Sequence, residues 1–376
     1  MRSDFLPLAR PCITDAEVEA VAEVLRSGYL TTGPKVSEFE EAVAGYIGDS
    51  VSAVALNSCT AGLYLALLVY GIKEGDEVIL PTWTFAATGH VVLWSGATPV
   101  LCDVEDSSLN IDTHKMEALI NKRTKALIPV HYAGYPCEMD KIMQLAKKHN
   151  LRVIEDAAHA IGTEYRGKKI GSFGELAVFS FYATKNLACG EGGMVVLKDK
   201  AIIEKIRKLS YFGINKHAFD RYTQKGSWYY QIEELGYKYN MDSIHAALGL
   251  AQLQRLEQMN SRRREIAKLY REGLDKRIRL TQDSSQHLHN YHLFPIRIDP
   301  KIIKRDILIQ KLKEHNIGSS VHFIPLHKHP FYRKIIKGEF PTADAAYEEI
   351  ISLPIFPAMS DEDTYYVIDT VNVLLK

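Results

Sequence analysis

The chain has 376 residues, with 46 Lys plus Arg and 46 Asp plus Glu. Equal numbers of the two charges leave no global field that would attract nucleic acid or an anionic membrane, so an anionic ligand must be bound by a local site. No apolar run approaches the roughly 20 residues of a membrane span, and the length favours a large domain followed by a smaller one.

Three absences narrow the class of protein further. The cysteines form no CxxC pair and are odd in number, which predicts free thiols in a reducing compartment; they are Cys12, Cys59, Cys102, Cys137 and Cys189. The first seven residues lack the apolar core of a signal peptide, so we expect a cytoplasmic protein. We expect no metal, because the histidines show no ligand spacing with Cys, Asp or Glu.

The first predicted element is a helix over 14–27. Thr14 and Glu17 are spaced as a capping box, and an apolar face is predicted on one side of the helix, made by Val18, Val21, Val24 and Leu25. A second helix is predicted at about 36–47. A short strand, 51–56, then leads into a helix at about 61–70.

Strands and helices alternate from there on. Strands are predicted at 77–80, 98–102, 124–130, 152–155, 177–181 and 193–197, and helices at 84–95, 112–121, 138–149 and 199–210. Short apolar strands that alternate with helices of about a dozen residues predict an α/β fold, with a mainly parallel sheet covered on both faces.

A long helix is predicted over 243–273, and we expect it to connect two domains, 1–250 and 251–376. The triplet Arg262-Arg263-Arg264 is interpreted as a solvated helix face. The C-terminal part alternates a strand at 292–298, a helix at 304–315, a strand at 319–322 and a helix at 360–375, which predicts a smaller α+β unit.

Asp156 ends an apolar run that is predicted to be a buried parallel strand. Its carboxylate would open at the carboxyl edge of the sheet, where open α/β sheets bind ligands. A buried carboxylate needs a cationic partner, and the pyridinium of pyridoxal 5′-phosphate (PLP) is one. The alternative is an Asp that caps a following helix at Ala157.

Lys185 follows a second apolar strand and precedes the turn Gly190-Glu191-Gly192-Gly193. A lysine at a strand end is usually at the surface. Here the pattern instead predicts the lysine that forms a Schiff base with PLP and then moves a proton as general base and acid.

The same reasoning assigns candidate contacts around the cofactor. The phosphate is expected at the helix start Ser58-Cys59-Thr60-Ala61-Gly62, with a further bond from Ser180; a plain helix cap is the alternative. Phe85 or Trp83 would stack on the ring or lie in the core. His159 lies three residues beyond Asp156 and is either a ring contact or a core histidine.

Together these stretches resemble the DegT/DnrJ family of PLP-dependent sugar-nucleotide aminotransferases, which have the aspartate-aminotransferase fold (fold type I). The matching runs span nearly the whole chain and include Asn57-Ser58-Cys59-Thr60-Ala61, Pro129-Val130-His131-Tyr132-Ala133-Gly134, Glu155-Asp156-Ala157-Ala158-His159, the run from Ser180 to Gly193, and Gly236-Tyr237-Lys238-Tyr239-Asn240-Met241.

The resemblance implies roles for individual residues. Lys185, Asp156 and His159 are implied to be catalytic, as the Schiff-base lysine, the pyridinium partner and the neighbour of the ring hydroxyl. Phe85 is implied to stack on the ring. The phosphate contacts would be Cys59, Thr60, Ser180 and, from the second subunit of a homodimer, Asn240. His159 stands where many members have Gln.

The substrates follow from the resemblance as well. L-glutamate would donate its amino group in a ping-pong reaction that releases 2-oxoglutarate, and the acceptor would be a nucleotide-linked keto-sugar, with a UDP-4-keto sugar aminated at C4 as the expectation. Tyr29, Thr31, Lys35 and His322 match segments that line the sugar-nucleotide pocket. After His322 the chain departs from the members that aminate a pentose.

Three rival classes make different predictions. A sugar 3-dehydratase of the same family would replace the lysine with His, whereas Lys185 is present. A non-catalytic regulator on this fold would have no need of a Schiff-base lysine. A nicotinamide dehydrogenase would need a GxGxxG turn after the first strand, and Asn57-Ser58-Cys59-Thr60-Ala61-Gly62 does not supply it.

Overall fold

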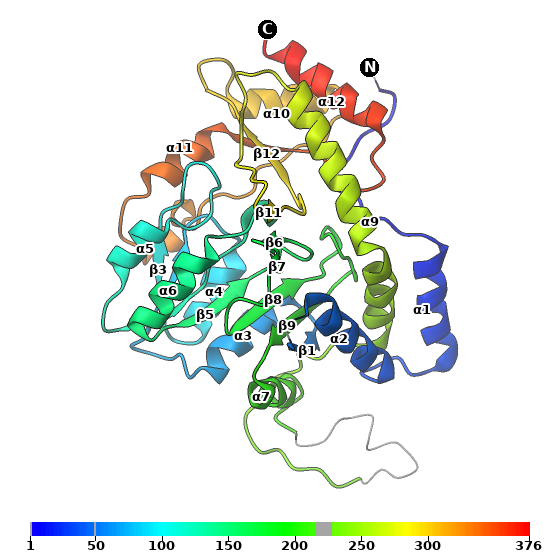
Figure 1. Ribbon diagram of the computed structural model, residues 1–376, viewed down its shortest axis with the longest axis vertical. Helices are drawn as coiled ribbons and strands as arrows, with labels where there is room; N and C mark the ends of the chain where they lie inside the picture. The colour runs from blue at the N-terminus through cyan, green and yellow to red at the C-terminus, as the bar shows by residue number, and fades with distance from the viewer. Residues whose placement is uncertain (1, 49, 215–227) are drawn as a thin grey trace.

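A seven-stranded sheet forms the larger part of the computed structural model, which describes residues 2–48, 50–214 and 228–376 (Figure 1). Its order is β1-β9-β8-β5-β4-β2-β3. The strands are β1 (Ser52–Leu56), β2 (Glu77–Pro81), β3 (Thr98–Cys102), β4 (Thr124–Leu127), β5 (Arg152–Asp156), β8 (Leu176–Ser180) and β9 (Gly193–Leu197). All neighbours are parallel except that β9 runs antiparallel to both β1 and β8. The predicted mainly parallel α/β sheet is confirmed.

Helices cover both faces of this sheet because alternate strand residues point to opposite sides. On β1, Val54 and Leu56 join one core with α3, α4 and α7, whereas Ala53 and Ala55 join a second core with α2, α5 and α6. The helices of this part are α1 (Asp15–Ser27), α2 (Pro34–Ile47), α3 (Cys59–Val69), α4 (Ala86–Trp94), α5 (Thr113–Leu119), α6 (Met139–His149) and α7 (Lys200–Ser210).

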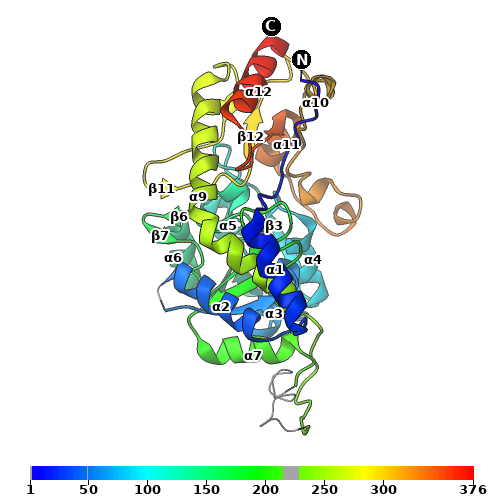
Figure 2. The same cartoon turned by 90° about the vertical axis from the view of Figure 1, so that its right-hand side faces the viewer.

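Helix α9 (Ser243–Gly273) has the predicted bounds and runs from the large sheet to the C-terminal unit (Figures 1 and 2). That unit holds an antiparallel sheet of β10 (Arg279–Leu280), β12 (Phe294–Arg297) and β13 (Ile350–Leu353), with α10 (Arg305–Glu314), α11 (Pro341–Glu349) and α12 (Asp361–Leu374). Short one-turn helices lie at Tyr132–Gly134, Leu326–Lys328 and Tyr332–Lys334. A third small sheet joins β6 (Glu164–Tyr165), β7 (Lys168–Lys169) and β11 (His287–Leu288).

The C-terminal unit has its own hydrophobic core, which begins on α9 at Ile266 and also includes Leu6 from the opposite end of the chain. Leu6 forms a bridge with Ile317, and the two chain ends lie close together in both views (Figures 1 and 2). The predicted domain boundary at residue 250 falls inside α9. Among the described residues, no helix is both long and apolar enough to cross a membrane.

Helix α1 has the predicted capping box, in which Glu17 accepts a hydrogen bond from the Thr14 backbone at 2.7 Å. The predicted apolar face is partly wrong: Val24 is buried, but Val18 and Leu25 are 58% and 54% exposed. The helix packs on α9 through a side that carries the buried Glu17, which accepts a hydrogen bond from Arg255 at 2.8 Å. The hydrophobic periodicity did not predict this side of α1 as the buried one, because the side contains the charged Glu17.

Two further expectations are wrong. Arg263 does not lie on a solvated face: it is 3% exposed and donates to three carbonyl groups, at 2.8 Å to Ile355, 3.3 Å to Tyr291 and 3.4 Å to His292. Burial lowers the pKa of Arg263 to about 10. Residues 319–322 form a single bridge rather than a strand, in which Ser320 pairs with Ser352 of β13.

Candidate active site

One cavity of about 490 Å³ lies at the carboxyl ends of β1, β5 and β8, between the large sheet and the C-terminal unit. Its wall contains seven of the predicted site residues, namely Cys59, Thr60, Phe85, Asp156, His159, Ser180 and Lys185, together with His322 from the predicted substrate pocket. Segments far apart in the sequence therefore meet at the edge of the sheet where ligands of α/β proteins bind.

Asp156 ends β5 and is 6% exposed. Its Oδ2 accepts a hydrogen bond from the Thr88 hydroxyl at 2.8 Å, and its Oδ1 accepts one from the Ala158 backbone at 3.2 Å. Burial raises the pKa of Asp156, and these hydrogen bonds oppose that rise. The carboxylate therefore accepts a hydrogen bond within the turn that follows β5, where no helix begins, and it lines the cavity.

Lys185 lies in the turn between β8 and β9 and is partly buried. Burial lowers the pKa of its amine to about 8, although Cys59 and Asp156 favour the charged form. The turn is closed by backbone hydrogen bonds, from Lys185 to Tyr182 at 2.8 Å and from Cys189 to Phe181 at 2.8 Å. A lysine with a lowered pKa has a larger neutral fraction near pH 8, and the neutral amine is the form that attacks a carbonyl.

The first turn of α3 forms a candidate anion cradle on one wall of the cavity. The Ser58 hydroxyl accepts a hydrogen bond from the Ala61 backbone at 3.1 Å, while Thr60 and Ser180 also line the cavity. The first N–H groups of a helix have no partner within it and favour an anion. A Cβ on Gly193 would lie 2.4 Å from the Cys59 nitrogen, so glycine is needed for β9 to approach this turn.

The structure distinguishes the two aromatic candidates for stacking on the ring. Phe85 is 63% exposed, lines the cavity and lies with its ring centroid 5.9 Å from that of Phe323. Trp83 is fully buried in the core, where it packs edge-on against Tyr132 and donates a hydrogen bond to the His322 carbonyl at 3.3 Å. Phe85 is therefore the aromatic that can reach a ligand ring.

Three buried or partly buried histidines also line the cavity: His159, His292 and His322. Burial lowers the pKa of His159 and of His292 well below the ordinary value, and lowers that of His322 to about 4. Near neutral pH the three imidazoles are therefore uncharged. Sequence reasoning missed His292, and it also missed Thr88, which lies one helical turn after Phe85.

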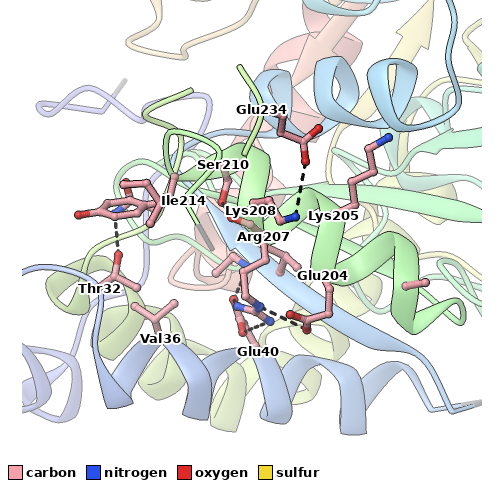
Figure 3. A pocket seen from close by; sticks show the side chains of 15 residues that line it. Thr32, Val36, Glu40, Glu204, Lys205, Arg207, Lys208, Ser210, Ile214 and Glu234 are labelled. Carbon is pink, nitrogen blue, oxygen red and sulfur yellow. Dashed lines mark hydrogen bonds and ion pairs between the residues drawn. The ribbon is translucent and has the colours of Figure 1, made fainter. Parts of the chain in front are cut away.

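Asn240 does not share this cavity. It lines a second cavity of about 360 Å³ between α2 and α7, whose other residues include Thr32, Glu40, Arg207 and Lys208 (Figure 3). Its amide nitrogen donates to the Thr32 hydroxyl at 2.6 Å. No residue lines both cavities within the described part of the chain.

The remaining substrate candidates also lie away from the Lys185 cavity. Tyr29 and Thr31 are exposed, and Lys35 pairs with Glu38 at 2.8 Å. The Thr31 carbonyl accepts a hydrogen bond from the Ser243 hydroxyl at 2.6 Å. Within one chain, only His322 of the predicted substrate residues reaches the cavity.

The cavity fits PLP on two independent observations. Asp156 is buried, and no described residue forms an ion pair with it. This is expected for a carboxylate whose cationic partner is the pyridinium of a cofactor. The buried Nδ1 of His159 has no hydrogen-bond partner among the described residues. With a lysine of lowered pKa and a helix N-terminus in the same cavity, the site and the fold define a PLP-dependent enzyme of fold type I.

Comparison with known proteins agrees with this class. The profile of the DegT/DnrJ/EryC1/StrS aminotransferase family matches residues 11–372. The spore coat polysaccharide biosynthesis protein SpsC of Bacillus subtilis is 46% identical over 385 residues, which cover 100% of this chain and 98% of SpsC.

Two solved structures share the fold over almost their whole length. The PLP form of Spr1654 from Streptococcus pneumoniae has a TM-score of 0.91 and 33% identity, covering 99% of this chain and 98% of that one. PseC of Helicobacter pylori, an aminotransferase involved in the biosynthesis of pseudoaminic acid, has a TM-score of 0.92 and 29% identity, covering 99% of both chains. The chain belongs to the DegT/DnrJ/EryC1/StrS aminotransferase family.

Proposed function

We propose that the protein transfers the amino group of L-glutamate to a nucleotide-linked keto-sugar, and that the acceptor is a UDP-4-keto sugar aminated at C4 for a bacterial surface polysaccharide. The observation that carries the proposal is the presence of Lys185 and Asp156 in one cavity at the edge of the sheet. The likeness to SpsC, a polysaccharide biosynthesis protein, and to PseC supports a sugar acceptor.

Bound PLP supplies an electron sink, which lets an amino group pass between two carbonyl compounds. Lys185 would hold the cofactor and, as an amine of lowered pKa, would move the proton at the substrate carbon. Asp156 would stabilise positive charge on the ring nitrogen, and Thr88 and Ala158 hold its carboxylate in one orientation. Phe85 would pack against the ring, and the first turn of α3 would hold the phosphate, since both line the cavity.

We further propose that the active unit is a homodimer in which Asn240 of one subunit completes the phosphate site of the other. Asn240 lies in a different cavity from Lys185 of its own chain, which agrees with a role at the partner's site. Exposed apolar side chains lie near Asn240 in the sequence, on the segment that includes Trp228, Ile232 and Leu235. Tyr29, Thr31 and Lys35 would contact the sugar nucleotide at the same interface.

The acceptor can be identified with a panel of keto-sugar nucleotides. Purified protein is incubated with PLP, L-glutamate and UDP-, TDP- or GDP-linked 3-keto or 4-keto sugars, and amino products are detected by mass spectrometry. We expect the largest yield with a UDP-4-keto sugar. Product from 3-keto sugars alone, or from another nucleotide alone, would overturn the substrate assignment while leaving the transaminase assignment intact.

A simpler experiment separates an aminotransferase from a regulator on the same fold. PLP bound to Lys185 should absorb in the near-visible, and that band should disappear when L-glutamate is added. Protein that binds PLP but keeps the band at saturating glutamate would support the regulator instead. A sugar 3-dehydratase is disfavoured because Lys185 occupies the position at which such an enzyme would carry His.

A further inference from the structure

A buried polar network connects the Lys185 turn to the C-terminal unit. Asn186, the residue after Lys185, is 4% exposed and donates through its amide nitrogen to the Asn260 side chain at 2.8 Å and to the Asn290 carbonyl at 3.1 Å. Its amide oxygen lies 3.0 Å from Nδ1 of His292. The network therefore ties the lysine turn to α9 and to the segment before β12.

These contacts determine which nitrogen of His292 carries the proton. A backbone carbonyl can only accept, so the Asn186 atom that faces Asn290 is the amide nitrogen, and the atom that faces His292 is the oxygen. Because that oxygen can only accept, Nδ1 of His292 is the donor. The Nε2 atom of the neutral ring is then an acceptor, and it has no hydrogen bond to any described residue.

His292 packs directly against His159. Their ring centroids are 4.3 Å apart with an interplanar angle of 37°, and Phe323 stacks on His159 at 5.7 Å. The titratable or charged groups that act on His292 are His159, Lys185, Arg263 and His322. All of them disfavour a second proton on His292, so the ring stays neutral when the lysine is charged.

We propose that His292 is a positioning residue that acts through His159: anchored to Asn186 by its Nδ1–H group, it presents a neutral imidazole that fixes the orientation of the His159 ring in the PLP cavity. The inference rests on the PLP-dependent part of the proposed function and is independent of which sugar is aminated. Nδ1 of His159 has no hydrogen-bond partner among the described residues, so the ring is oriented by packing, with His292 the nearest ring at 4.3 Å, ahead of Phe323 at 5.7 Å and Tyr132 at 6.5 Å.

The test is the pH titration of the near-visible band of PLP-loaded protein, which reports the charge on the linkage between Lys185 and the cofactor. His292→Phe keeps a ring against His159 but removes the N–H anchor and the ring nitrogens. We expect the midpoint to fall by about 0.5 pH unit or more. The reason is that the His159 ring, the polar neighbour proposed to stabilise the cationic linkage, would be misplaced once His292 no longer positions it. The glutamate half-reaction should slow by about tenfold.

A matched control lies three residues away. His289 is 3% exposed and donates through Nε2 to the Ala133 carbonyl at 3.1 Å, but it does not line the cavity. His289→Phe should lower thermal stability without moving the midpoint. If His292→Phe does not fold, His292→Asn keeps a donor for Asn186 while removing the ring, and it should shift the midpoint in the same direction.

A double-mutant cycle tests whether His292 acts through His159. In a His159→Phe background, His292→Phe should cause no additional shift. The proposal is overturned if His292→Phe moves the midpoint by less than about 0.2 pH unit, or if the two shifts add. Failure of the proposed function looks different, since wild-type protein would then lack the PLP band or its response to glutamate.

Discussion

The Thr88 hydroxyl donates a hydrogen bond to Oδ2 of Asp156 over 2.8 Å, and both residues are buried at the cavity wall. The same hydroxyl lies 2.7 Å from that of Thr84. A buried carboxylate is costly unless it is hydrogen-bonded, and these contacts hold it in one orientation. Helix α4 thus contributes to the cofactor site although none of its own residues was predicted to do so.

Thr88→Val should weaken PLP binding about tenfold, because a charge-assisted hydrogen bond of about 1.5 kcal/mol is lost without a change in side-chain shape. The dissociation constant can be measured by absorbance titration of apoprotein with PLP. Thr84→Val is the matched control, since it leaves the bond between Thr88 and Asp156 in place, and its effect should be smaller. Equal effects of the two variants would contradict the role given to Thr88.

Capture of PLP should depend on pH through Lys185. Burial lowers the pKa of its amine from 10.5 to about 8, and only the neutral amine attacks the aldehyde. The rate constant for PLP binding to apoprotein should therefore rise up to about tenfold per pH unit below pH 8 and level off above it. Stopped-flow absorbance measures this rate. A rise that continues to pH 10 would indicate an unperturbed lysine.

Lys185→Ala should reduce turnover by at least about 1,000-fold, because we propose that this residue both binds the cofactor and moves the proton. Circular dichroism and the thermal unfolding midpoint should show a folded protein. Lys185→Arg is a useful companion, since it keeps a cation of similar length but cannot form the linkage. Multiple-turnover transamination by either variant would refute the assignment.

The proposed sharing of active sites between two subunits makes a specific prediction for mixed dimers. Asn240→Asp should inactivate the homodimer, because a carboxylate would face the cofactor phosphate. When this variant is mixed with Lys185→Ala and the subunits exchange, one site of each heterodimer combines an intact Lys185 with an intact Asn240. Activity should then recover, up to half of the wild-type value per heterodimer. No recovery, despite heterodimers detected by native mass spectrometry, would place Asn240 outside the partner's site.

Arg263→Met should destabilise the protein by about 2–4 kcal/mol, because three buried carbonyl groups lose their donor. Arg262→Ala is the control on the same helix: that arginine is partly exposed and pairs with the exposed Asp361, so its loss should cost less than about 1 kcal/mol. Urea denaturation measures both changes. Similar losses for the two variants would mean that the buried position of Arg263 has no energetic consequence.

The sequence alone determined the features that depend on neighbours along the chain. Short apolar runs predicted the strands of the large sheet, and β3, β9 and α9 have the predicted bounds. Asp156 and Lys185 were found because Asp156 ends one such strand and Lys185 follows another, and these two strands run parallel and end at the same edge of the sheet. The capping box at Thr14 is equally local, since its two hydrogen bonds join residues three apart.

Only the tertiary structure decided which side chains meet across distant segments. Val18 is exposed although it fits an apolar face, and Arg263 is buried although it lies in a charged triplet, because the packing of α9 against α1 and the C-terminal unit selects the buried side. His292 and Thr88 both line the cavity although they are 204 residues apart in the sequence. Such contacts depend on how the C-terminal unit packs against the edge of the large sheet. No pattern within either segment predicts which residues of the other segment will lie beside it.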